Sequence, residues 1–276
     1  MTVLVTGCTG NTGRPLVAAL RARGADVRAA ARRPGPGGVR LDWADARTHA
    51  PALAGARAVY LVPPPLTVDP MPLVGPFLEE AREAGVRRVV LLGSLAELPG
   101  VPGAAEVGRA VRSFAEWAVL RPSGFMQNFT GAHPVAAGIR ERGEIRSATG
   151  EGRLGWIDAA DIAAVAAELL SAPEPVAGEY VLTGPEAFGY SEAAAVIAEV
   201  AGRPVRHTPA PVAEMVRRNV DAGMPEAFAA ALAGVDSGIA AGREDRVTDT
   251  VHRLTGRPPR AFRDFARAHR HEWAPA

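Results

Sequence analysis

Residues 2–13 read TVLVTGCTGNTG, a short apolar run that leads directly into glycines at positions 7, 10 and 13. A strand followed by glycines three residues apart and then by a helical pattern is typical of the first βα unit of a dinucleotide-binding domain. In such a unit Gly7 permits the tight turn, Gly10 lets the backbone approach a pyrophosphate, and Gly13 lets helix and sheet pack closely. The stretch therefore predicts a Rossmann-type α/β fold.

The same loop is expected to hold the phosphates of a dinucleotide. They would lie at a helix N-terminus, where unpaired N–H groups and the positive end of the helix dipole favour anions. Cys8, the one cysteine of the chain, is interpreted as a small filler, because no resolving thiol or basic activator lies near it in sequence. The predicted cofactor contacts in the loop are Gly7, Thr9, Gly10, Asn11, Thr12 and Gly13.

The first half of the chain alternates strand-like and helical patterns, the order expected of βαβ units in a parallel sheet. Pro/Gly clusters at 32–38, 63–65 and 99–103 each follow a predicted strand. They lie where an open α/β sheet forms its ligand crevice, although ordinary turn chemistry accounts for any one cluster alone. The predicted strands are 2–7, 26–31, 57–62, 87–93 and 117–120, and the predicted helices are 12–23, 47–54, 70–84 and 105–114.

Beyond about residue 125 the helical patterns become longer and richer in alanine. We predict a doubly wound parallel sheet with helices on both faces and a smaller, mostly helical C-terminal substrate lobe. The dinucleotide-binding domain is placed at 1–125, with 156–183 returning to it, and the lobe at 126–155 and 184–276. The later predicted strands are 144–147 and 179–183, and the helices are 158–171, 191–201, 210–222, 225–240, 244–254 and 258–271.

The residues that follow the second strand indicate which dinucleotide is bound. About 20 residues beyond the glycines, NAD-binding proteins place an acidic residue on the ribose 2′-hydroxyl. This sequence has Arg32 and Arg33 there instead. A guanidinium group suits a 2′-phosphate, so NADP(H) is the predicted cofactor; a solvated arginine pair is the alternative and explains less.

Strand order predicts further contacts with the adenosine half of the cofactor. Asp42 and Trp43 follow a short third strand and are expected to flank the adenine. Loop capping by Asp42 and core packing by Trp43 are equally good interpretations. Val62 and Pro63 are expected to pass beneath the adenine ribose and the pyrophosphate.

The ends of the next strands are expected near the nicotinamide. Gly93 and Ser94 close the fifth strand, and Ser94 is the best hydroxyl for orienting the substrate or the carboxamide; capping of the following segment is its alternative role. Pro122 and Phe125 are predicted to form an apolar wall, with core packing an equal alternative for Phe125. Asn128 is predicted to bond the substrate or to fix its loop.

Composition excludes several classes of partner. The formal net charge of +1, with charges of both signs interleaved, gives no basic stripe for nucleic acid. A single cysteine favours the reducing cytoplasm and rules out a thiolate metal cluster. No export signal and no apolar run of roughly 20 residues is present, so no membrane association is expected. His269 and His271 would face different sides of a helix, which argues against a metal site. His133 could reach the pocket, but a lone loop histidine is interpreted as solvated.

The motifs resemble the NmrA-like family of atypical short-chain dehydrogenases, and within it the branch of ergot-alkaloid-like dehydrogenases that includes agroclavine and festuclavine dehydrogenases. This resemblance implies a Rossmann fold, NADP(H) and a small-molecule substrate, in a monomer or homodimer. The family also contains quinone oxidoreductases and NADP-sensing regulators, and fold likeness does not choose among them. The matching stretches are VTGCTGNTGRPLV, GVRRVVLLGS (85–94), WAVLRPSGFMQNF (117–129), GWIDAADIAAVAAELL (155–170), YVLTGPEAFGYSEAAAVIAEVAGRPV (180–205) and LTGRPPRAFRDFA.

The chain contains no lysine, which removes the Tyr-x-x-x-Lys pair of typical short-chain dehydrogenases. None of its tyrosines, Tyr60, Tyr180 and Tyr190, follows the fifth strand on the expected helix. Loss of a general acid costs about 10²–10⁴-fold in rate, roughly 3–5 kcal/mol of barrier. We therefore expect substrates that accept hydride without simultaneous protonation.

An iminium ion is such a substrate, and enones and quinones are intermediate cases that solvent can protonate afterwards. The sequence thus predicts an NADPH-dependent oxidoreductase of secondary metabolism. The alternative is a non-catalytic NADP(H)-sensing regulatory protein of the NmrA type. A conventional carbonyl reductase requires an unusual donor such as Ser94 and is the least favoured reading.

Overall fold

The computed structural model describes residues 1–273 except 97, 99 and 102, so the predicted Pro/Gly cluster at 99–103 lies partly outside the described residues. The chain forms two compact units. Unit 1 comprises Met1–Ser94, Val101–Arg121 and Ala159–Val181. Unit 2 comprises Leu95–Gly100, Pro122–Asp158 and Leu182–Ala276.

Unit 1 is built on a seven-stranded sheet of order β3-β2-β1-β4-β5-β6-β8. Strands β1 to β6 pair in parallel, which confirms the predicted doubly wound α/β fold. The order reverses at β1, and in such sheets the ligand crevice opens beyond the carboxyl ends of the strands at this reversal. The strands are β1 (Thr2–Val5), β2 (Asp26–Ala31), β3 (Val39–Arg40), β4 (Ala58–Leu61), β5 (Arg88–Leu92), β6 (Glu116–Pro122) and β8 (Ala177–Leu182).

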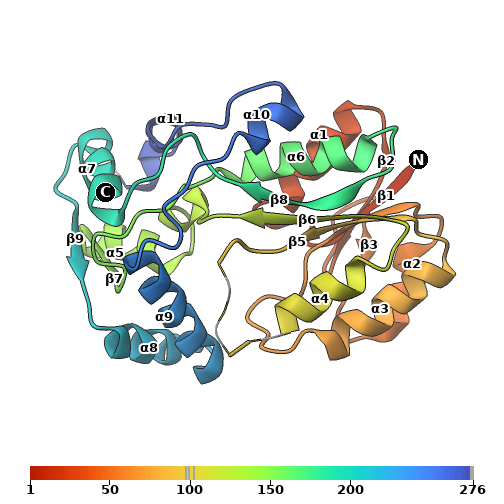
Figure 1. Cartoon of the computed structure of the whole chain (residues 1–276), viewed down its shortest axis with the longest axis horizontal. Coiled ribbons are helices and arrows are strands. Elements are labelled where there is room, and N and C mark those ends of the chain that lie inside the picture. Colours follow the sequence, from red (N-terminus) through yellow and green to blue (C-terminus); the bar gives the residue numbers. More distant parts are fainter. Residues whose placement is uncertain (97, 99, 102, 274–276) are drawn as a thin grey trace. The chain divides into compact units, whose positions relative to one another are not determined.

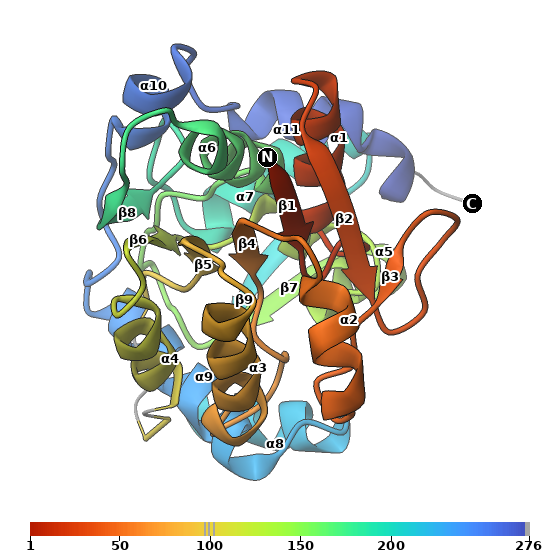
Figure 2. The ribbon, with the colours of Figure 1, turned by 90° about the vertical axis from the view of Figure 1, so that its right-hand side faces the viewer.

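Helices cover both faces of this sheet (Figures 1 and 2). Helices α1 and α6 lie on one face, and α2, α3 and α4 lie on the other. Leu16 and Leu20, one turn apart on α1, are both buried, because their spacing places them on one face of the helix. The helices are α1 (Gly13–Ala22), α2 (His49–Leu53) after the 3₁₀ turn η1 (Ala46–Thr48), α3 (Met71–Glu83), α4 (Gly103–Val111) and α6 (Ala159–Ser171).

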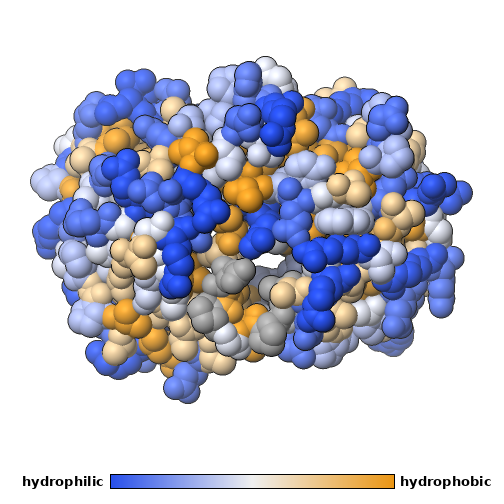
Figure 3. Space-filling model, viewed as in Figure 1, coloured by the Kyte–Doolittle hydropathy of each residue, from blue (hydrophilic) through white to orange (hydrophobic). Residues whose placement is uncertain are grey.

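Unit 2 contains a two-stranded parallel sheet, β7 (Glu144–Ser147) and β9 (Arg206–Pro209), surrounded by helices. Its core is aromatic: Phe129 packs edge-on against Trp156, Tyr190 and Phe262. Figure 3 shows apolar surface over α9, whose sequence is rich in alanine. The remaining elements are η2 (Met126–Phe129), α5 (Pro134–Arg142), α7 (Tyr190–Ala201), α8 (Val212–Asp221), α9 (Glu226–Ala240), α10 (Thr250–Thr255), α11 (Phe262–Ala268) and η3 (Arg270–Glu272).

The predictions for unit 2 need correction in three places. Strand β9 was not predicted, and neither was helix α5. The predicted helix 244–254 is wrong over its first half. Gly242, just before it, has φ +77°, and the N–H of Thr248 donates to Thr183 Oγ1 at 2.9 Å instead of entering a helix. Helix α10 begins only at Thr250.

In the described part of the chain, no helix has both the length and the apolar character that a membrane span requires.

Candidate functional site

The glycine-rich loop begins where β1 is tied to β4. The hydroxyl of Thr6 is fully buried; it donates to Tyr60 O at 3.0 Å and accepts the N–H of Val62 at 2.8 Å. One side chain thus satisfies polar backbone groups of the neighbouring strand at the point where the strand order reverses. The start of the loop is held rigidly against the sheet.

Backbone geometry constrains the glycines of the motif. Gly7 has φ +62°, a conformation that favours glycine, and its carbonyl accepts the N–H of Gly10 at 2.9 Å. A Cβ atom on Gly13 would lie 2.2 Å from that same carbonyl oxygen. The turn and the first residue of α1 therefore fit together only because Gly7 and Gly13 have no side chains.

The start of α1 leaves backbone donors available. Asn11 and Thr12 donate no backbone hydrogen bond within the described chain, and no side chain caps the helix. Unpaired N–H groups at a helix N-terminus favour an anion. This is the arrangement that a pyrophosphate requires.

The predicted phosphate clamp lies beside this turn. The N–H of Cys8 donates to Ala30 O at 3.2 Å, which joins the glycine loop to the end of β2, two residues before Arg32. Arg32 and Arg33 are exposed and form no ion pair or hydrogen bond with the residues that the structure describes. In contrast, Arg40 lies 3.7 Å from carboxylate oxygens of two nearby aspartates. Both guanidinium groups of the pair are free to receive an anionic ligand.

Asp42 and Trp43 have structural partners of their own. Oδ1 of Asp42 accepts the N–H of Ala44 at 3.2 Å, so this side chain caps its turn. Trp43 is partly buried and packs edge-on against His49 and Phe77, with ring centroids 6.1 and 5.2 Å away. These are the capping and packing roles that the sequence left open, and they leave a role in cofactor binding as a proposal.

Val62 and Pro63 follow β4 directly. Both are partly buried, and a Cβ atom added to Gly7 would lie 3.3 Å from the Cβ atom of Val62. Val62 therefore packs against the glycine turn, and its predicted place beneath the adenine ribose and the pyrophosphate stays a prediction. Pro63 continues the same segment.

Gly93 and Ser94 follow β5. The N–H of Gly93 donates to Leu120 O at 2.9 Å, which extends the pairing with β6 by one residue. The hydroxyl of Ser94 is exposed and caps nothing within the described chain, while its carbonyl accepts Arg121 Nε at 3.3 Å. The hydroxyl is thus available to a ligand, and the alternative capping role is not observed.

The predicted apolar wall residues belong to unit 2. Pro122 is buried, whereas Phe125 is partly exposed and lies outside the aromatic core cluster. The N–H of Asn128 donates to Phe125 O at 3.0 Å, so the backbone fixes this turn, and the Asn128 side chain has no partner among the described residues. Phe125 and Asn128 both keep surface that a ligand can reach.

Sequence reasoning missed the group that secures this turn. Gln127 Nε2 donates to Asp158 Oδ1 at 2.8 Å, and Arg260 Nη1 donates to Asp158 Oδ2 at 3.1 Å. The Asp158 side chain is only 3% exposed, so the two bonds compensate for its burial. The three residues are far apart in sequence, and no local pattern predicts their meeting.

The interpretation of His133 as a solvated residue is wrong. His133 caps α5, since its Nδ1 accepts the N–H of Val135 at 3.2 Å, and burial lowers its pKa. His269 stacks on Phe265, with ring centroids 4.1 Å apart. Among the described residues, no group of three or more His, Cys, Asp or Glu side chains is arranged to hold a metal ion.

Two of the three tyrosines and the cysteine are poorly suited to proton exchange. Burial raises the pKa of Tyr60, which lies in β4, and the pKa of Tyr190, which opens α7. Burial also raises the pKa of the Cys8 thiol, which favours its protonated, unreactive form.

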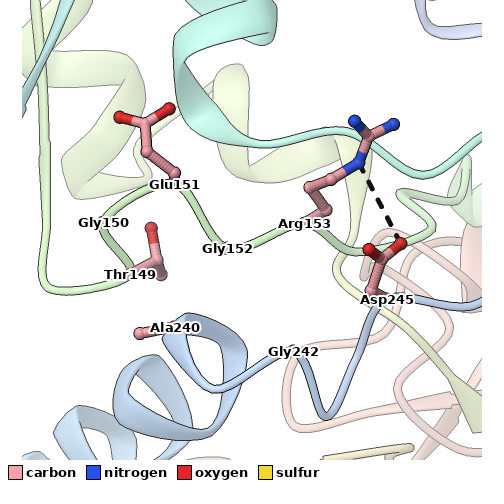
Figure 4. A pocket seen from close by; sticks show the side chains of 8 residues that line it. All are labelled: Thr149, Gly150, Glu151, Gly152, Arg153, Ala240, Gly242 and Asp245. Carbon is pink, nitrogen blue, oxygen red and sulfur yellow. Dashed lines mark ion pairs between the residues drawn. The ribbon is translucent and has the colours of Figure 1, made fainter.

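Unit 2 contains a cavity of about 310 Å³ (Figure 4). One wall is the loop from Thr149 to Arg153, and the other is the end of α9 with the turn that follows it. Arg153 faces Asp245 across the cavity, with 4.0 Å between Nε and the carboxylate. The lining residues are Thr149, Gly150, Glu151, Gly152, Arg153, Ala240, Gly242 and Asp245.

Comparison with known proteins assigns the chain to a family. It is 41% identical to the uncharacterized oxidoreductase YesF of Bacillus subtilis, over 98% of this chain and 96% of the relative. It is 34% identical to the NAD(P)H azoreductase of Xenophilus azovorans over 97% of both chains, and 33% identical to the agroclavine dehydrogenase of Claviceps fusiformis over 99% of both. No family model matches the sequence.

Solved structures agree on the fold. A nucleoside-diphosphate-sugar epimerase of Staphylococcus aureus superposes with a TM-score of 0.84 at 20% identity, covering 97% of this chain and all of that one. The triphenylmethane reductase of a Citrobacter species superposes with a TM-score of 0.81 at 22% identity, covering 98% of this chain and all of that one.

The fold and the glycine-rich site define a dinucleotide-dependent enzyme class. The chain belongs to the family of NAD(P)H-dependent oxidoreductases that includes the bacterial azoreductase and the fungal agroclavine dehydrogenases.

Proposed function

We propose that this chain is an NADPH-dependent reductase that transfers hydride to a small organic acceptor of the iminium, enone or quinone type, in the NmrA-like, ergot-alkaloid-dehydrogenase-like branch of its family. The observation that carries the cofactor choice is the bond between Cys8 N–H and Ala30 O. It brings the anion-binding turn next to the end of β2, where the free guanidinium groups of Arg32 and Arg33 follow. A pyrophosphate and a 2′-phosphate would be held by these two neighbouring groups.

The proposed class of acceptor follows from the proton donors that the chain lacks. The chain has no lysine, and the pKa of two of its three tyrosines is raised by burial. Ser94, Pro122, Phe125 and Asn128 are proposed to line the nicotinamide end, and Ser94 and Asn128 to orient the acceptor. NADPH itself supplies the hydride, while these side chains position the acceptor and exclude water.

The names of the relatives support this class of chemistry. One relative is named an NAD(P)H azoreductase, an enzyme that reduces the conjugated N=N bond of an azo compound, and another is named a dehydrogenase of agroclavine. The azoreductase name supports the proposal of a conjugated acceptor.

The experiment is a panel assay of NADPH oxidation with N-methylacridinium, 1,4-naphthoquinone and an azo dye, combined with calorimetry of NADPH and NADH. We expect turnover with at least one acceptor and tighter binding of NADPH. NADPH binding without turnover of any acceptor would favour the sensor alternative. Absence of binding would remove the proposed cofactor site.

A further inference from the structure

Leu66, in the loop that follows β4, has an unusual backbone conformation. Its φ is +56°, and every other residue with a positive φ in the described part of the chain is a glycine. A leucine side chain strains the backbone in this left-handed conformation, whereas glycine or asparagine adopts it more easily. Strain of this kind persists only where the surrounding structure imposes it, and it is concentrated at functional sites.

The surroundings of Leu66 do not explain a leucine either. The residue is 48% exposed, so its side chain contributes little to the core of unit 1. The backbone conformation favours glycine or asparagine, and the exposure favours a polar side chain. A contact with an apolar ligand explains both departures, because it would cover the side chain that the protein leaves in water.

The loop that carries Leu66 is fixed at both ends. Its start is tied to the end of β1 by the N–H of Val62, which donates to a buried threonine hydroxyl at 2.8 Å. Three prolines follow at 63–65 and restrict φ, and Thr67 Oγ1 donates to the carbonyl of the last of them at 3.2 Å. At its end Pro70 is buried, and a Cβ atom added to Gly103 would lie 2.4 Å from Pro70 Cδ. The neighbouring residues therefore impose the conformation of the turn.

This loop emerges at the edge of the sheet that carries the proposed cofactor site. Strand β4 lies between β1 and β5, and all three are parallel, so the segments that follow them lie side by side. The glycine loop follows β1, and Ser94 follows β5. Residues 62–64 at the base of the loop are partly buried, whereas Leu66 is exposed at its turn. The dinucleotide is proposed to lie against Val62 and Pro63, which leaves the turn for a second ligand.

We propose that Leu66 is a substrate-binding residue whose side chain packs against the conjugated ring of the acceptor. The inference rests on the proposed function, which places hydride transfer at this edge of unit 1. An apolar side chain and a flat ring remove each other's surface from water. Because the loop is already fixed, little further ordering is needed when the ring binds. Such a contact is made in the bound substrate and in the transition state alike, so it lowers KM and leaves kcat unchanged.

Leu66→Asn tests the contact. Asparagine suits the left-handed conformation but presents a polar side chain to the ring. For each acceptor of the panel that the wild type reduces, KM should rise at least about tenfold, in line with the loss of one apolar side-chain contact. The kcat and the NADPH dissociation constant should stay within about twofold. Leu66→Met keeps an apolar side chain of similar volume and should hold KM within about threefold of the wild type.

Urea unfolding separates binding from support of the fold. Leu66→Asn relieves strain and removes no core contact, so its unfolding midpoint should equal or exceed that of the wild type. Val247→Asn is the matched control, because Val247 is 49% exposed but has no positive φ. It should change neither KM nor the midpoint.

Three results would overturn the inference. A lower midpoint for Leu66→Asn would show that the side chain stabilises the fold, and an unchanged KM would show that it does not contact the acceptor. Weaker NADPH binding at unchanged KM would assign the side chain to the cofactor. In each case the proposed function stands, since the wild type still reduces an acceptor. A wild type that reduces none of the panel would remove both.

Discussion

The carbonyl oxygen of Gly7 occupies the space next to the α-carbon of Gly13, so a methyl group there would lie only 2.2 Å from it. Because that oxygen also accepts the N–H of Gly10, it cannot move without opening the turn. The contact that packs the loop closely therefore also fixes the positions of the backbone N–H donors at the start of α1.

Gly13→Ala should reduce both stability and cofactor binding. Overpacking of this kind costs about 1–3 kcal/mol, and we expect a loss at the upper end because the obstructing atoms are backbone. The NADPH dissociation constant should rise at least about tenfold. Urea unfolding and calorimetry measure the two effects. Gly108→Ala in α4, where a Cβ atom would meet nothing within 4 Å, is the control and should be neutral or slightly stabilising.

Arg32→Ala and Arg33→Ala should each weaken NADPH more than NADH. A charge-assisted hydrogen bond contributes about 1.5–3 kcal/mol, so the NADPH dissociation constant should rise about 10- to 100-fold for at least one variant, with little change for NADH. Calorimetry with both dinucleotides measures this. Arg109→Ala on α4, whose guanidinium group pairs with Glu106, controls for the loss of one positive charge. Equal weakening of both dinucleotides would show that neither arginine binds the 2′-phosphate.

The sequence predicted the sheet of unit 1 and the glycine loop because their causes are local. The short, buried apolar runs of β1, β4 and β5 are recognisable as strands from their own sequence. Gly7 is recognisable because the turn in which it lies requires a positive φ. The alternation of strands with helices then permits few strand orders.

The features that the sequence did not predict depend on distant partners. Strand β9 reads RHTP, with no apolar alternation, and exists because it pairs with β7 about 60 residues earlier, from Glu144 opposite Arg206 to Ser147 opposite Pro209. The bond between Arg260 and Asp158 joins residues 102 positions apart. His133 looked solvated because a lone histidine in a loop usually is, and only the path of α5 gives its ring a partner.

Ser94→Ala should lower kcat without weakening NADPH binding. Its hydroxyl is exposed at the end of β5 and caps nothing within the described chain, so its removal leaves no protein group unpaired. Loss of one orienting hydrogen bond should reduce kcat about tenfold, which is roughly 1.4 kcal/mol. Steady-state kinetics with the best acceptor of the panel measures this. Ser171→Ala, at the exposed end of α6, is the control; equal kcat in both variants would assign Ser94 no role in turnover.

The stability of the protein should fall as the pH drops below about 6.5, in part because of His133. Burial lowers the pKa of His133 below its ordinary value of 6.5, so in this pH window the unfolded chain binds a proton that the folded chain resists. Stability from this residue is complete above pH 6.5 and is lost as the pH falls towards the lower pKa of the folded state. Burial lowers the pKa of His207 as well, so His207 adds to the loss in the same direction.

His133→Asn isolates the contribution of this residue. Asparagine also caps helices, so it can accept the N–H of Val135 in place of Nδ1, and it does not titrate. We expect the difference in unfolding free energy between pH 7.5 and pH 5.5, measured with urea, to be smaller in this variant than in the wild type. His252→Asn, at an exposed position on α10, should leave the difference unchanged. If His133→Asn and the wild type lose the same free energy over this range, protonation of the cap contributes nothing to acid sensitivity, and the loss must come from His207 or from the carboxylates.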